Sequence, residues 1–165
     1  MSARAAARLE GLGFRRVYRY TGGKADWFAA GLPREGREAG TPRAGDLARR
    51  DIPACLPDEG VGQAWERAQA AGWSACAVVD RERVVLGLLR ARALTRSDPS
   101  VRVEDVMHPA PRTYRAGASL DGPVRYMRER GLDAVLITTP DGVLIGMLRR
   151  ADAEPYVRET DAGGA

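Results

Sequence analysis

The apolar positions of this chain repeat one pattern twice, 59 positions apart. In each copy a run of apolar residues, 75–79 or 134–137, is followed by a polar break and a second apolar run, 84–89 or 143–148. Apolar runs of this length between turn residues favour buried strands over helices. The second break ends in an Asp-Gly pair, which is typical of hairpin turns because glycine accepts a positive φ. Each copy is therefore predicted to form two strands joined by a tight turn.

An amphipathic segment precedes each pair of predicted strands. Apolar residues recur at helical spacing over residues 61–71 and again over residues 120–127. Ser119 is the expected N-cap of the second helix. A further short helix is expected after each pair, starting at Arg92 and at Asp152. The pattern thus predicts an α+β fold built from two similar helix-strand-strand-helix units.

The two units align without a gap. Between residues 72–90 and residues 131–149, six of the 19 positions are identical, and most of the others exchange one apolar side chain for another. A repeated unit usually cannot bury its apolar face alone. The two units are therefore expected to pack on each other about a pseudo-twofold axis, and residues 44–154 are expected to fold cooperatively.

Short motifs open and close both copies. The second copy opens with Glu-Asp-Val-Met at 104–107 and closes with Gly-Met-Leu-Arg-Arg-Ala-Asp at 146–152. The first copy has Gly-Asp-Leu at 45–47 and Gly-Leu-Leu-Arg at 87–90. Together with the ungapped repeat, these motifs resemble the cystathionine-β-synthase (CBS) domain, which normally occurs as a tandem pair. The resemblance covers about residues 44–154.

The resemblance implies a first CBS module at residues 44–98 and a second at residues 99–156. Residues 37–43 are polar and contain glycine, so they are interpreted as a linker. The tail at residues 157–165 ends in Gly-Gly-Ala and is expected to be disordered.

Residues 1–36 follow a different pattern. Apolar residues at helical spacing predict a first helix that ends at Gly13, and residues 16–20 alternate as a strand does. A second, short helix over residues 25–30 carries Trp27, which is expected to dock against the body of the protein or a second subunit. The segment resembles the C-terminal part of a rhodanese-like domain.

The rhodanese resemblance does not predict an enzyme. The rhodanese reaction needs a sulfur-accepting cysteine on a loop whose N–H groups stabilise an anion. The two cysteines, Cys55 and Cys76, do not lie in such a loop, and the single histidine, His108, has no carboxylate at catalytic spacing. The chain is therefore expected to be non-catalytic. The alternative is a rhodanese-type sulfurtransferase whose cysteine loop lies on an upstream part.

The charge distribution argues against a nucleic-acid function. Residues 1–43 hold nine basic and four acidic groups, residues 44–98 hold eight of each, and residues 99–165 hold nine and ten. The net charge of +4 therefore arises in the N-terminal segment and forms no basic stripe along the repeats. No apolar run approaches the ~20 residues of a membrane span, and no secretory signal is visible. A cytoplasmic protein without a membrane partner is expected.

The closing motif carries the candidate ligand site. The CBS resemblance implies that a Ser or Thr after the second strand meets phosphate or ribose, and that an Asp three residues later holds the ribose hydroxyls. The second module keeps this aspartate as Asp152, but Arg149 occupies the hydroxyl position and Arg150 follows it. In the first module the two positions are Arg90 and Ala93, so the ribose site there is expected to be lost and at most one nucleotide is expected per chain.

The resemblance also implies an adenine slot formed by main chain near Ala134 and Val135 and near Thr113 and Tyr114. The two arginines of the closing motif have two interpretations: they clamp a ligand phosphate, or they are solvated residues at a helix start. Asp152 likewise has a second interpretation, as the N-cap of the last helix.

These features predict a non-enzymatic regulatory protein that senses an adenosine-containing ligand or mediates protein association. AMP, ADP, ATP and S-adenosylmethionine are the candidate regulatory ligands, and no metal or required cofactor is predicted. A homodimer formed through the CBS pair and a further protein partner are the expected associations. A structural dimerisation module without a ligand is the remaining alternative.

Overall fold

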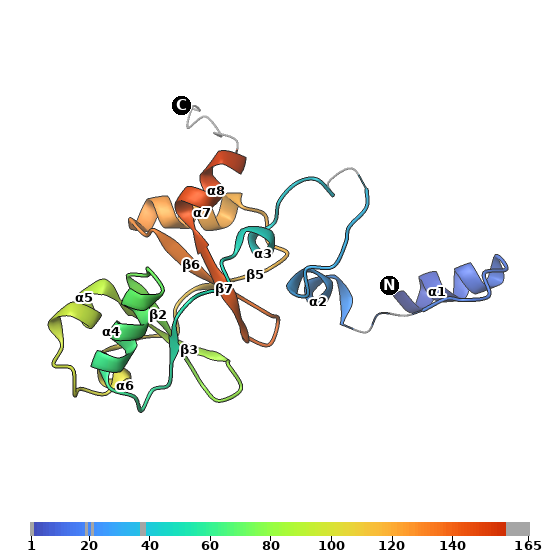
Figure 1. The fold of residues 1–165 in the computed structure, drawn as a ribbon. Coiled ribbons are helices and arrows are strands. Elements are labelled where there is room, and N and C mark those ends of the chain that lie inside the picture. Colours follow the sequence, from blue (N-terminus) through green and yellow to red (C-terminus); the bar gives the residue numbers. More distant parts are fainter. Residues whose placement is uncertain (1, 19, 21, 37–38, 158–165) are drawn as a thin grey trace.

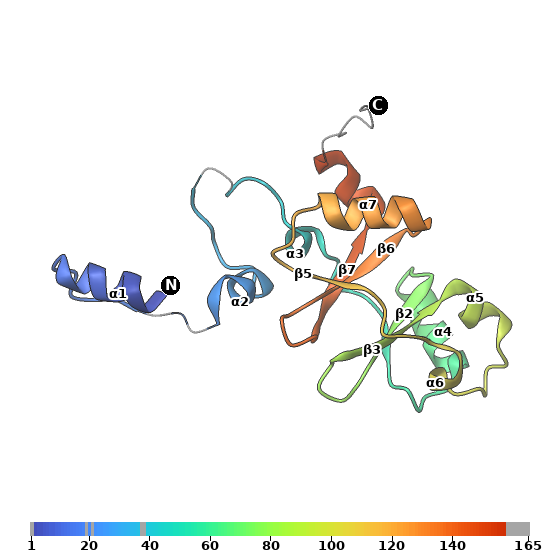
Figure 2. The ribbon, with the colours of Figure 1, turned by 180° about the vertical axis from the view of Figure 1, so that it is seen from behind.

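The computed structural model describes residues 2–18, 20, 22–36 and 39–157 (Figures 1 and 2). The N-terminal part holds α1 (Ser2–Gly11) and α2 (Gly23–Ala29). The first repeat contains α3 (Ala44–Leu47), β1 (Ala54–Cys55), α4 (Val61–Ala70), β2 (Ala75–Val79), β3 (Val85–Arg90) and α5 (Ala91–Arg96). The second repeat contains α6 (Val103–Val106), β4 (His108–Pro109), β5 (Thr113–Arg115), α7 (Asp121–Arg130), β6 (Ala134–Thr138), β7 (Leu144–Arg149), α8 (Arg150–Ala153) and a 3-10 helix (Glu154–Tyr156). The predicted helix-strand-strand-helix order is confirmed in both repeats.

The strands form two sheets with the same pairing pattern. One sheet has the order β1-β2-β3-β4, and the other has the order β5-β6-β7. In each sheet the first strand of the hairpin, β2 or β6, pairs in parallel with the short strand before the amphipathic helix, β1 or β5. It pairs antiparallel with the second strand of the hairpin, β3 or β7. Ala77 faces Leu88 in the first hairpin and Leu136 faces Met147 in the second, so the hairpins keep the 59-residue offset of the repeat.

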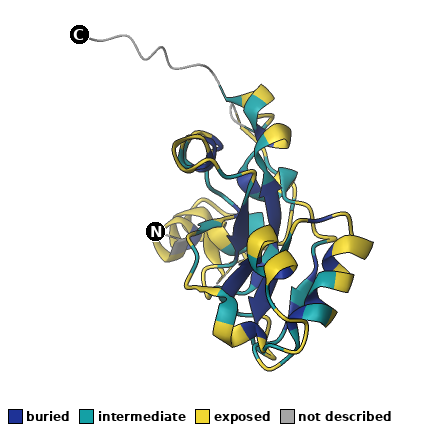
Figure 3. Cartoon of the chain, turned by 90° about the vertical axis from the view of Figure 1, so that its left-hand side faces the viewer, coloured by how far each residue is buried: buried dark blue, intermediate teal, exposed yellow. Residues whose placement is uncertain are grey.

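Alternate residues of each central strand face opposite sides of the sheet. In β2, Cys76 and Val78 share a core with α4, whereas Ala77 and Val79 face the other sheet. Helices therefore cover one face of each sheet, and the opposite sheet covers its second face. The strands are buried in the interior, and the helices around them carry the exposed residues (Figure 3). This double burial explains why the strand sequences are continuously apolar rather than alternating.

A core between the sheets joins the two modules. Its buried members come from both hairpins and from the turn before β2: Trp73, Ala77, Val79, Leu88, Leu136, Leu144 and Met147. The expectation that the two repeats pack on each other is therefore confirmed.

The opening helix of each repeat packs on the other repeat. In α3, the backbone N–H of Ala44 donates to Ala118 O (3.0 Å) and that of Gly45 donates to Ala116 O (2.8 Å). In α6, the N–H of Val103 donates in the same way to Glu59 O (2.9 Å). Each module in space is thus completed by a segment that belongs, in sequence, to the other.

The opening segment of each repeat passes close to a glycine of the other repeat, and these two glycines, Gly87 and Gly146, occupy the same position in the two copies. The backbone of Arg49 exchanges two hydrogen bonds with Met147 in β7 (both 2.9 Å), and β4 pairs with β3 in the first module. A Cβ at Gly146 would overlap the carbonyl group of Arg49, and a Cβ at Gly87 would overlap the side chain of Met107. Gly146 is therefore required by the close approach of backbone, and Gly87 leaves room for the Met107 side chain.

The N-terminal segment reaches the second module through α2. Phe28 packs partly buried against the core of that module, where its ring fills the space beside Gly117. Trp27 instead makes local contacts, because its Nε1 donates to Pro33 O (2.8 Å) and its ring meets Tyr20 edge-on at 5.2 Å. Helix α1 extends away from the body in Figures 1 and 2. The docking residue is thus Phe28 rather than Trp27.

Some local predictions are wrong. The described residues 16–18 and 20 form no strand, because their alternation finds no partner strand to pair with. Helix α7 begins at Asp121, with Leu120 as N-cap and no side-chain cap, so Ser119 is not its N-cap. In the predicted disordered tail, all residues beyond Val157 lie outside the described residues.

Candidate functional site

A cleft opens where the two modules meet. Its walls are Gly72, Trp73 and Ser74 from the first module and Asp133, Ala134, Arg149, Arg150, Ala151 and Glu154 from the second, and its volume is about 430 Å³. We refer to this site as the inter-module cleft. The turn before β2 forms one wall, and the end of β7 with the start of α8 forms the other.

Arg149 spans the cleft. It is the last residue of β7, where it pairs with Ala134, and also the N-cap of α8. Its guanidinium carbon lies 4.1 Å from the centroid of the Trp73 ring, and its Nη2 donates to Gly72 O at 3.2 Å. A guanidinium over an indole face is attracted by the ring quadrupole. This contact ties the second module to the first at the mouth of the cleft.

Arg150 is held by two carboxylates of its own module. Its backbone N–H donates to Asp133 O (2.8 Å), and its Nη2 donates to Asp133 Oδ1 (3.3 Å). Its Nη1 lies 3.7 Å from Glu154 Oε1, which also accepts a hydrogen bond from Arg128 Nε (2.9 Å). The positive charges of Arg149 and Arg150 are therefore matched in number by the negative charges of Asp133 and Glu154, which also line the cleft.

Two buried donors on the cleft walls have no acceptor among the described residues. They are Trp73 Nε1 and Arg150 Nε. The Trp73 side chain is almost fully enclosed, with 7% of the residue exposed. An unsatisfied buried donor costs about 1–3 kcal/mol, so native proteins rarely keep one without a reason. Both atoms are shielded from solvent, so a molecule bound in the cleft would accept hydrogen bonds from them only after a shift of these side chains.

The structure brings together some of the predicted site residues and separates others. Ala134, Arg149 and Arg150 line the inter-module cleft as a group. Val135 is buried in the core of the second module, where it pairs with Leu148. The cleft therefore contains the predicted arginines and one of the two predicted adenine-slot residues of β6.

Thr113 and Tyr114 lie elsewhere, on β5. They line a separate cavity of about 570 Å³ that also includes Phe28 of the N-terminal segment. Tyr114 packs beside Tyr126, and the guanidinium of Arg112 lies over both rings, at 5.4 and 4.8 Å. These two predicted residues do not contribute to the inter-module cleft.

Asp152 lies beside the cleft without lining it. It is the third residue of α8 and is exposed, while Arg149 is the N-cap, so the interpretation of Asp152 as the N-cap is wrong. Its charge acts on Arg49, whose pKa is raised chiefly by the hydrogen bond to Asp51 and to a smaller extent by Asp152. Arg149 also helps to lower the pKa of Asp51, after the larger effect of Arg49. Asp152 therefore belongs to a charged cluster that adjoins the cleft at Arg149.

Two residues of the cleft, Trp73 and Glu154, were not predicted from the sequence. Trp73 aligns with Leu132 in the repeat, so it reads as one apolar residue exchanged for another. The indole N–H of Trp73 could have indicated a site, because a tryptophan at a core position needs a hydrogen-bond acceptor and a leucine does not.

Comparison with protein families decides the classification. A family model of the CBS domain matches residues 44–99 and again residues 103–156. This chain belongs to the CBS domain family. The two matches correspond to the two repeats, so the predicted tandem CBS pair is confirmed. A comparison with curated proteins gave no significant match.

Solved structures share the fold of this CBS pair. One is the cytosolic domain of the Mg²⁺ channel MgtE in complex with ATP (TM-score 0.65, 21% identity), which covers 70% of this chain while the chain spans only 49% of that structure. Another is the CBS domains of a transcriptional regulator from Streptococcus pneumoniae (TM-score 0.64, 16% identity, covering 68% of this chain and 97% of that one). A third is CBSX2 in complex with AMP (TM-score 0.61, 21% identity, covering 69% and 94%).

None of these comparisons supports a rhodanese-like segment or a sulfurtransferase. Cys55 and Cys76 are both buried in the core of the first CBS module. Contact with Cys76 and burial raise the pKa of the Cys55 thiol far above its ordinary value, so this thiol is a poor nucleophile. His108 is exposed on β4, and the described residues contain no group of side chains that could hold a metal ion.

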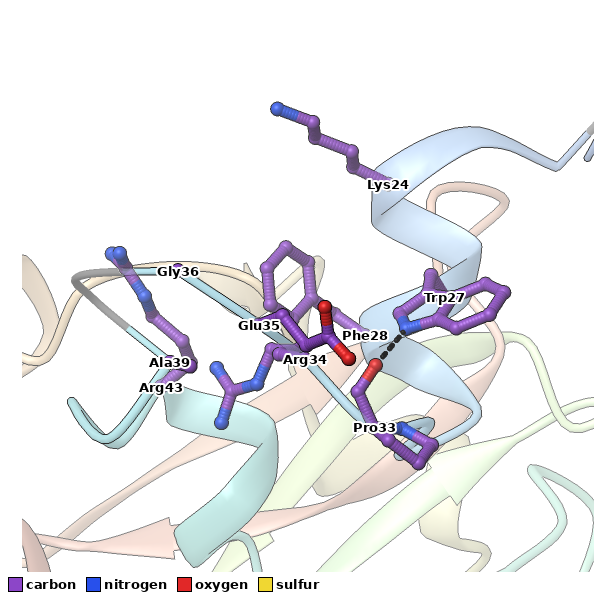
Figure 4. A pocket seen from close by; sticks show the side chains of 9 residues that line it. All are labelled: Lys24, Trp27, Phe28, Pro33, Arg34, Glu35, Gly36, Ala39 and Arg43. Carbon is purple, nitrogen blue, oxygen red and sulfur yellow. Dashed lines mark hydrogen bonds between the residues drawn. The ribbon is translucent and has the colours of Figure 1, made fainter.

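A larger cavity lies outside the CBS pair. It has a volume of about 590 Å³ and is formed by α2 and the linker that follows it (Figure 4). Of the two arginines that line it, Arg34 and Arg43, Arg34 forms a salt bridge with Asp46 (2.5 Å) and lies 5.3 Å from the Phe28 ring. Lys24 points away from it (Figure 4). We therefore interpret this cavity as the space under the N-terminal segment.

Among the described helices, none is both long and apolar enough to cross a bilayer.

Proposed function

We propose that this CBS pair is a non-catalytic regulatory module that binds an adenosine-containing ligand at the inter-module cleft. AMP, ADP, ATP and S-adenosylmethionine are the candidates. The proposal is carried by the two buried donors, Trp73 Nε1 and Arg150 Nε, which lack acceptors among the described residues. The ATP and AMP complexes of MgtE and CBSX2 show that proteins with this fold hold such ligands, and they motivate the choice of ligand class.

The cleft residues suggest a division of roles. Arg149 and Arg150 carry fork-shaped donors that suit phosphate oxygens, and Trp73 offers an additional N–H. Asp152 is exposed on α8 outside the lining of the cleft, and it would meet the ribose hydroxyls of a ligand that extends past Arg149. Ala134 would supply main-chain contacts to the base. In this arrangement a phosphate competes with Asp133 and Glu154 for Arg150, so binding loosens the contacts that Arg150 makes in the free protein.

Regulation would follow from the position of the cleft. The turn at Trp73 belongs to the first module and α8 belongs to the second, so a ligand that contacts both changes the free energy of their packing. A ligand affects a conformational equilibrium only through its different affinity for the two states. The contact between Arg149 and Trp73 is one element whose strength a ligand phosphate would alter.

Calorimetry with each of the four ligands tests this proposal. We expect at most one ligand per chain and a weaker complex for Trp73→Phe, which keeps an aromatic ring but removes the buried N–H. The expected loss is about 0.5–1.5 kcal/mol, or roughly twofold to tenfold in affinity. Trp65→Phe is the matched control, because Trp65 packs against the core of the first module and does not line the cleft. No heat with any ligand at millimolar concentration, or an equal loss in both variants, would refute the nucleotide-binding proposal.

Protein association is the second candidate function. It is favoured by the large apolar side chains that the N-terminal segment exposes: Leu9, Leu12, Phe14, Tyr18 and Tyr20. We propose a homodimer formed through the CBS pair, with the N-terminal segment contacting the second copy. Light scattering of the full chain and of residues 37–165 tests both parts. A dimer in both samples supports the CBS pair as the interface, and a monomer in both refutes the homodimer.

A further inference from the structure

A cavity of about 570 Å³ lies at the edge of the second-module sheet, between β5 and α2, which lie side by side in Figures 1 and 2. It shares no lining residue with the inter-module cleft. One wall belongs to the CBS pair, and the other wall, with Lys24, Ala25 and Phe28, belongs to the N-terminal segment. We refer to it as the β5-edge cavity. The N-terminal segment lies outside both CBS matches, so it builds a site that the CBS pair alone does not have.

The backbone of β5 is open to a further strand on the side of this cavity. β5 is the outer strand of the order β5-β6-β7, so within the sheet it pairs only with β6. Thr113 and Tyr114 form no backbone hydrogen bond outside the sheet with any described residue, whereas the carbonyl of Arg115 accepts one from the N–H of Ala118 (3.0 Å). An open strand edge of this kind can pair with an extended segment of another chain.

The cavity carries an excess of positive charge. Its cationic side chains are those of Lys24, Arg112 and Arg115. No carboxylate lines it, and none of the three cations forms a salt bridge in the described part of the chain. Arg112 lies over the rings of Tyr114 and Tyr126, at 5.4 and 4.8 Å, and Arg115 donates to Thr138 Oγ1 (2.9 Å). Uncharged partners therefore hold both guanidinium groups in place without neutralising them.

We propose that the β5-edge cavity binds an extended acidic segment of a partner protein, which adds a strand to the sheet beside β5. The open edge of β5 supplies the main-chain hydrogen bonds of such a strand. The cations of the cavity supply charge-assisted hydrogen bonds to its carboxylates. Phe28 and Tyr114 line the cavity from its two walls, so an apolar side chain of the segment packs between their rings.

Charge decides which segment is the occupant. The exposed N-terminal stretch of residues 14–18 carries Arg15 and Arg16 and no acidic residue, so the cations of the cavity repel it. A second copy of the CBS pair offers no acidic excess either, since residues 44–165 hold 17 basic and 18 acidic groups. Alternate side chains of a strand face opposite sides, so a partner in which acidic and apolar residues alternate matches the cavity. The inference depends neither on a ligand in the cleft nor on a homodimer.

Fluorescence anisotropy on the full chain tests this site with a labelled peptide, acetyl-Glu-Val-Glu-Phe-Glu-Val-Glu-amide. One control peptide has lysine in place of each glutamate. A second keeps the acidic sequence but carries N-methyl groups on alternate amides, so its backbone cannot pair as a strand. We expect the acidic peptide to bind and both control peptides to bind about tenfold or more weakly, because each lacks one of the two kinds of contact.

A pair of double variants locates the bound peptide. Lys24→Gln/Arg112→Gln removes two exposed cations of the cavity and should weaken binding about fivefold or more. Arg92→Gln/Arg96→Gln is the control, because it makes the same change of net charge at exposed positions of α5 in the first module. This control should bind the acidic peptide as the wild type does.

Four outcomes would overturn the proposal. The first is the absence of binding of the acidic peptide to the wild-type chain, and the second is an equal loss in both double variants. The third is undiminished binding of the N-methylated peptide, which would show that no strand is added. The fourth is a loss of self-association in Lys24→Gln/Arg112→Gln without peptide, measured by light scattering, which would make a second copy the occupant. Nucleotide binding in the cleft can succeed or fail without changing these results.

Discussion

Arg149 of the second CBS module stacks on Trp73 of the first, with the guanidinium carbon 4.1 Å from the ring centroid. The same side chain donates to Gly72 O at 3.2 Å. The contact crosses the module boundary, so its strength depends on how the two modules are oriented. It lies at the mouth of the cleft in which we propose ligand binding.

The first prediction concerns this contact. Arg149→Ala should lower the free energy of unfolding by about 1–2 kcal/mol, because it removes a partly buried cation–π pair and a hydrogen bond to the backbone. Chemical denaturation monitored by circular dichroism measures the change. Arg130→Ala, at an exposed position on α7, should stay within about 0.5 kcal/mol of the wild type. An effect of Arg149→Ala as small as this would show that the stacking adds nothing to stability.

The second prediction concerns the exchange of opening helices. A fragment of residues 44–157 should melt in one sharp transition, since it contains both repeats and both exchanged segments. A fragment of residues 99–157 should not, because it lacks α3, whose N–H groups bond to Ala116 and Ala118. Thermal denaturation of the two fragments compares them. A cooperative melt of the shorter fragment would contradict the interlocked arrangement.

The third prediction separates two neighbouring aromatic residues. Phe28→Ala should lower stability by about 1–2 kcal/mol, because its half-buried ring covers part of the second-module core. Trp27→Ala should cost less than Phe28→Ala, since the hydrogen bond and the ring contact of Trp27 are both made within the N-terminal segment. Urea denaturation of both variants measures the order. The reverse order would return the docking role to Trp27.

The fourth prediction compares the two matched glycines. Gly146→Ala should destabilise by about 1–3 kcal/mol, because its Cβ would meet the backbone carbonyl of Arg49, which cannot move without breaking the pairing with Met147. Gly87→Ala should cost less, since the atom its Cβ meets first is Sδ of Met107, near the end of a flexible side chain. Equal costs would show that the exchanged segments tolerate displacement equally. Thermal unfolding of the two variants decides.

The fifth prediction concerns Asp152. If it holds the ribose of the ligand, Asp152→Ala should weaken adenine-nucleotide binding at least about tenfold, at about 1.5–3 kcal/mol for hydrogen bonds to a charged group. Stability should change little, because Asp152 is exposed and Arg149 is the N-cap of α8. Calorimetry and thermal unfolding on the same variant test both parts. Unchanged affinity would remove Asp152 from the proposed site and leave the cleft arginines to be tested separately.

Periodicity in the sequence predicted the parts of the fold that depend on local burial. The hairpins, the two amphipathic helices and the packing of the repeats on each other all follow from apolar runs and their spacing. The exchange of α3 and α6 does not, because an apolar face indicates that a helix needs a partner without saying which one. The described residues 16–18 and 20 form no strand where one was expected, because alternation alone provides no neighbouring strand.

The candidate site was predicted only in part for a similar reason. Arg149 ends β7 and Arg150 follows it directly, so their position could be inferred from the repeat and the closing motif. The contribution of Trp73 depends on the relative orientation of the modules, which no local pattern contains. Asp152 was considered as an N-cap because the last helix was expected to start there. Since α8 begins at Arg150, directly after β7, the N-cap is Arg149, three residues earlier.

The interlocking of α3 and α6 also constrains how such a protein can change by recombination. A crossover at the boundary between the repeats, near residue 98, would separate β3 from β4 and deprive each half of the segment that closes its sheet. Neither half could be inherited alone as a folded unit. We instead expect insertions and fusions to be tolerated before α3, which opens the interlocked body. The pair, rather than the single repeat, is therefore the element that can be transferred between proteins.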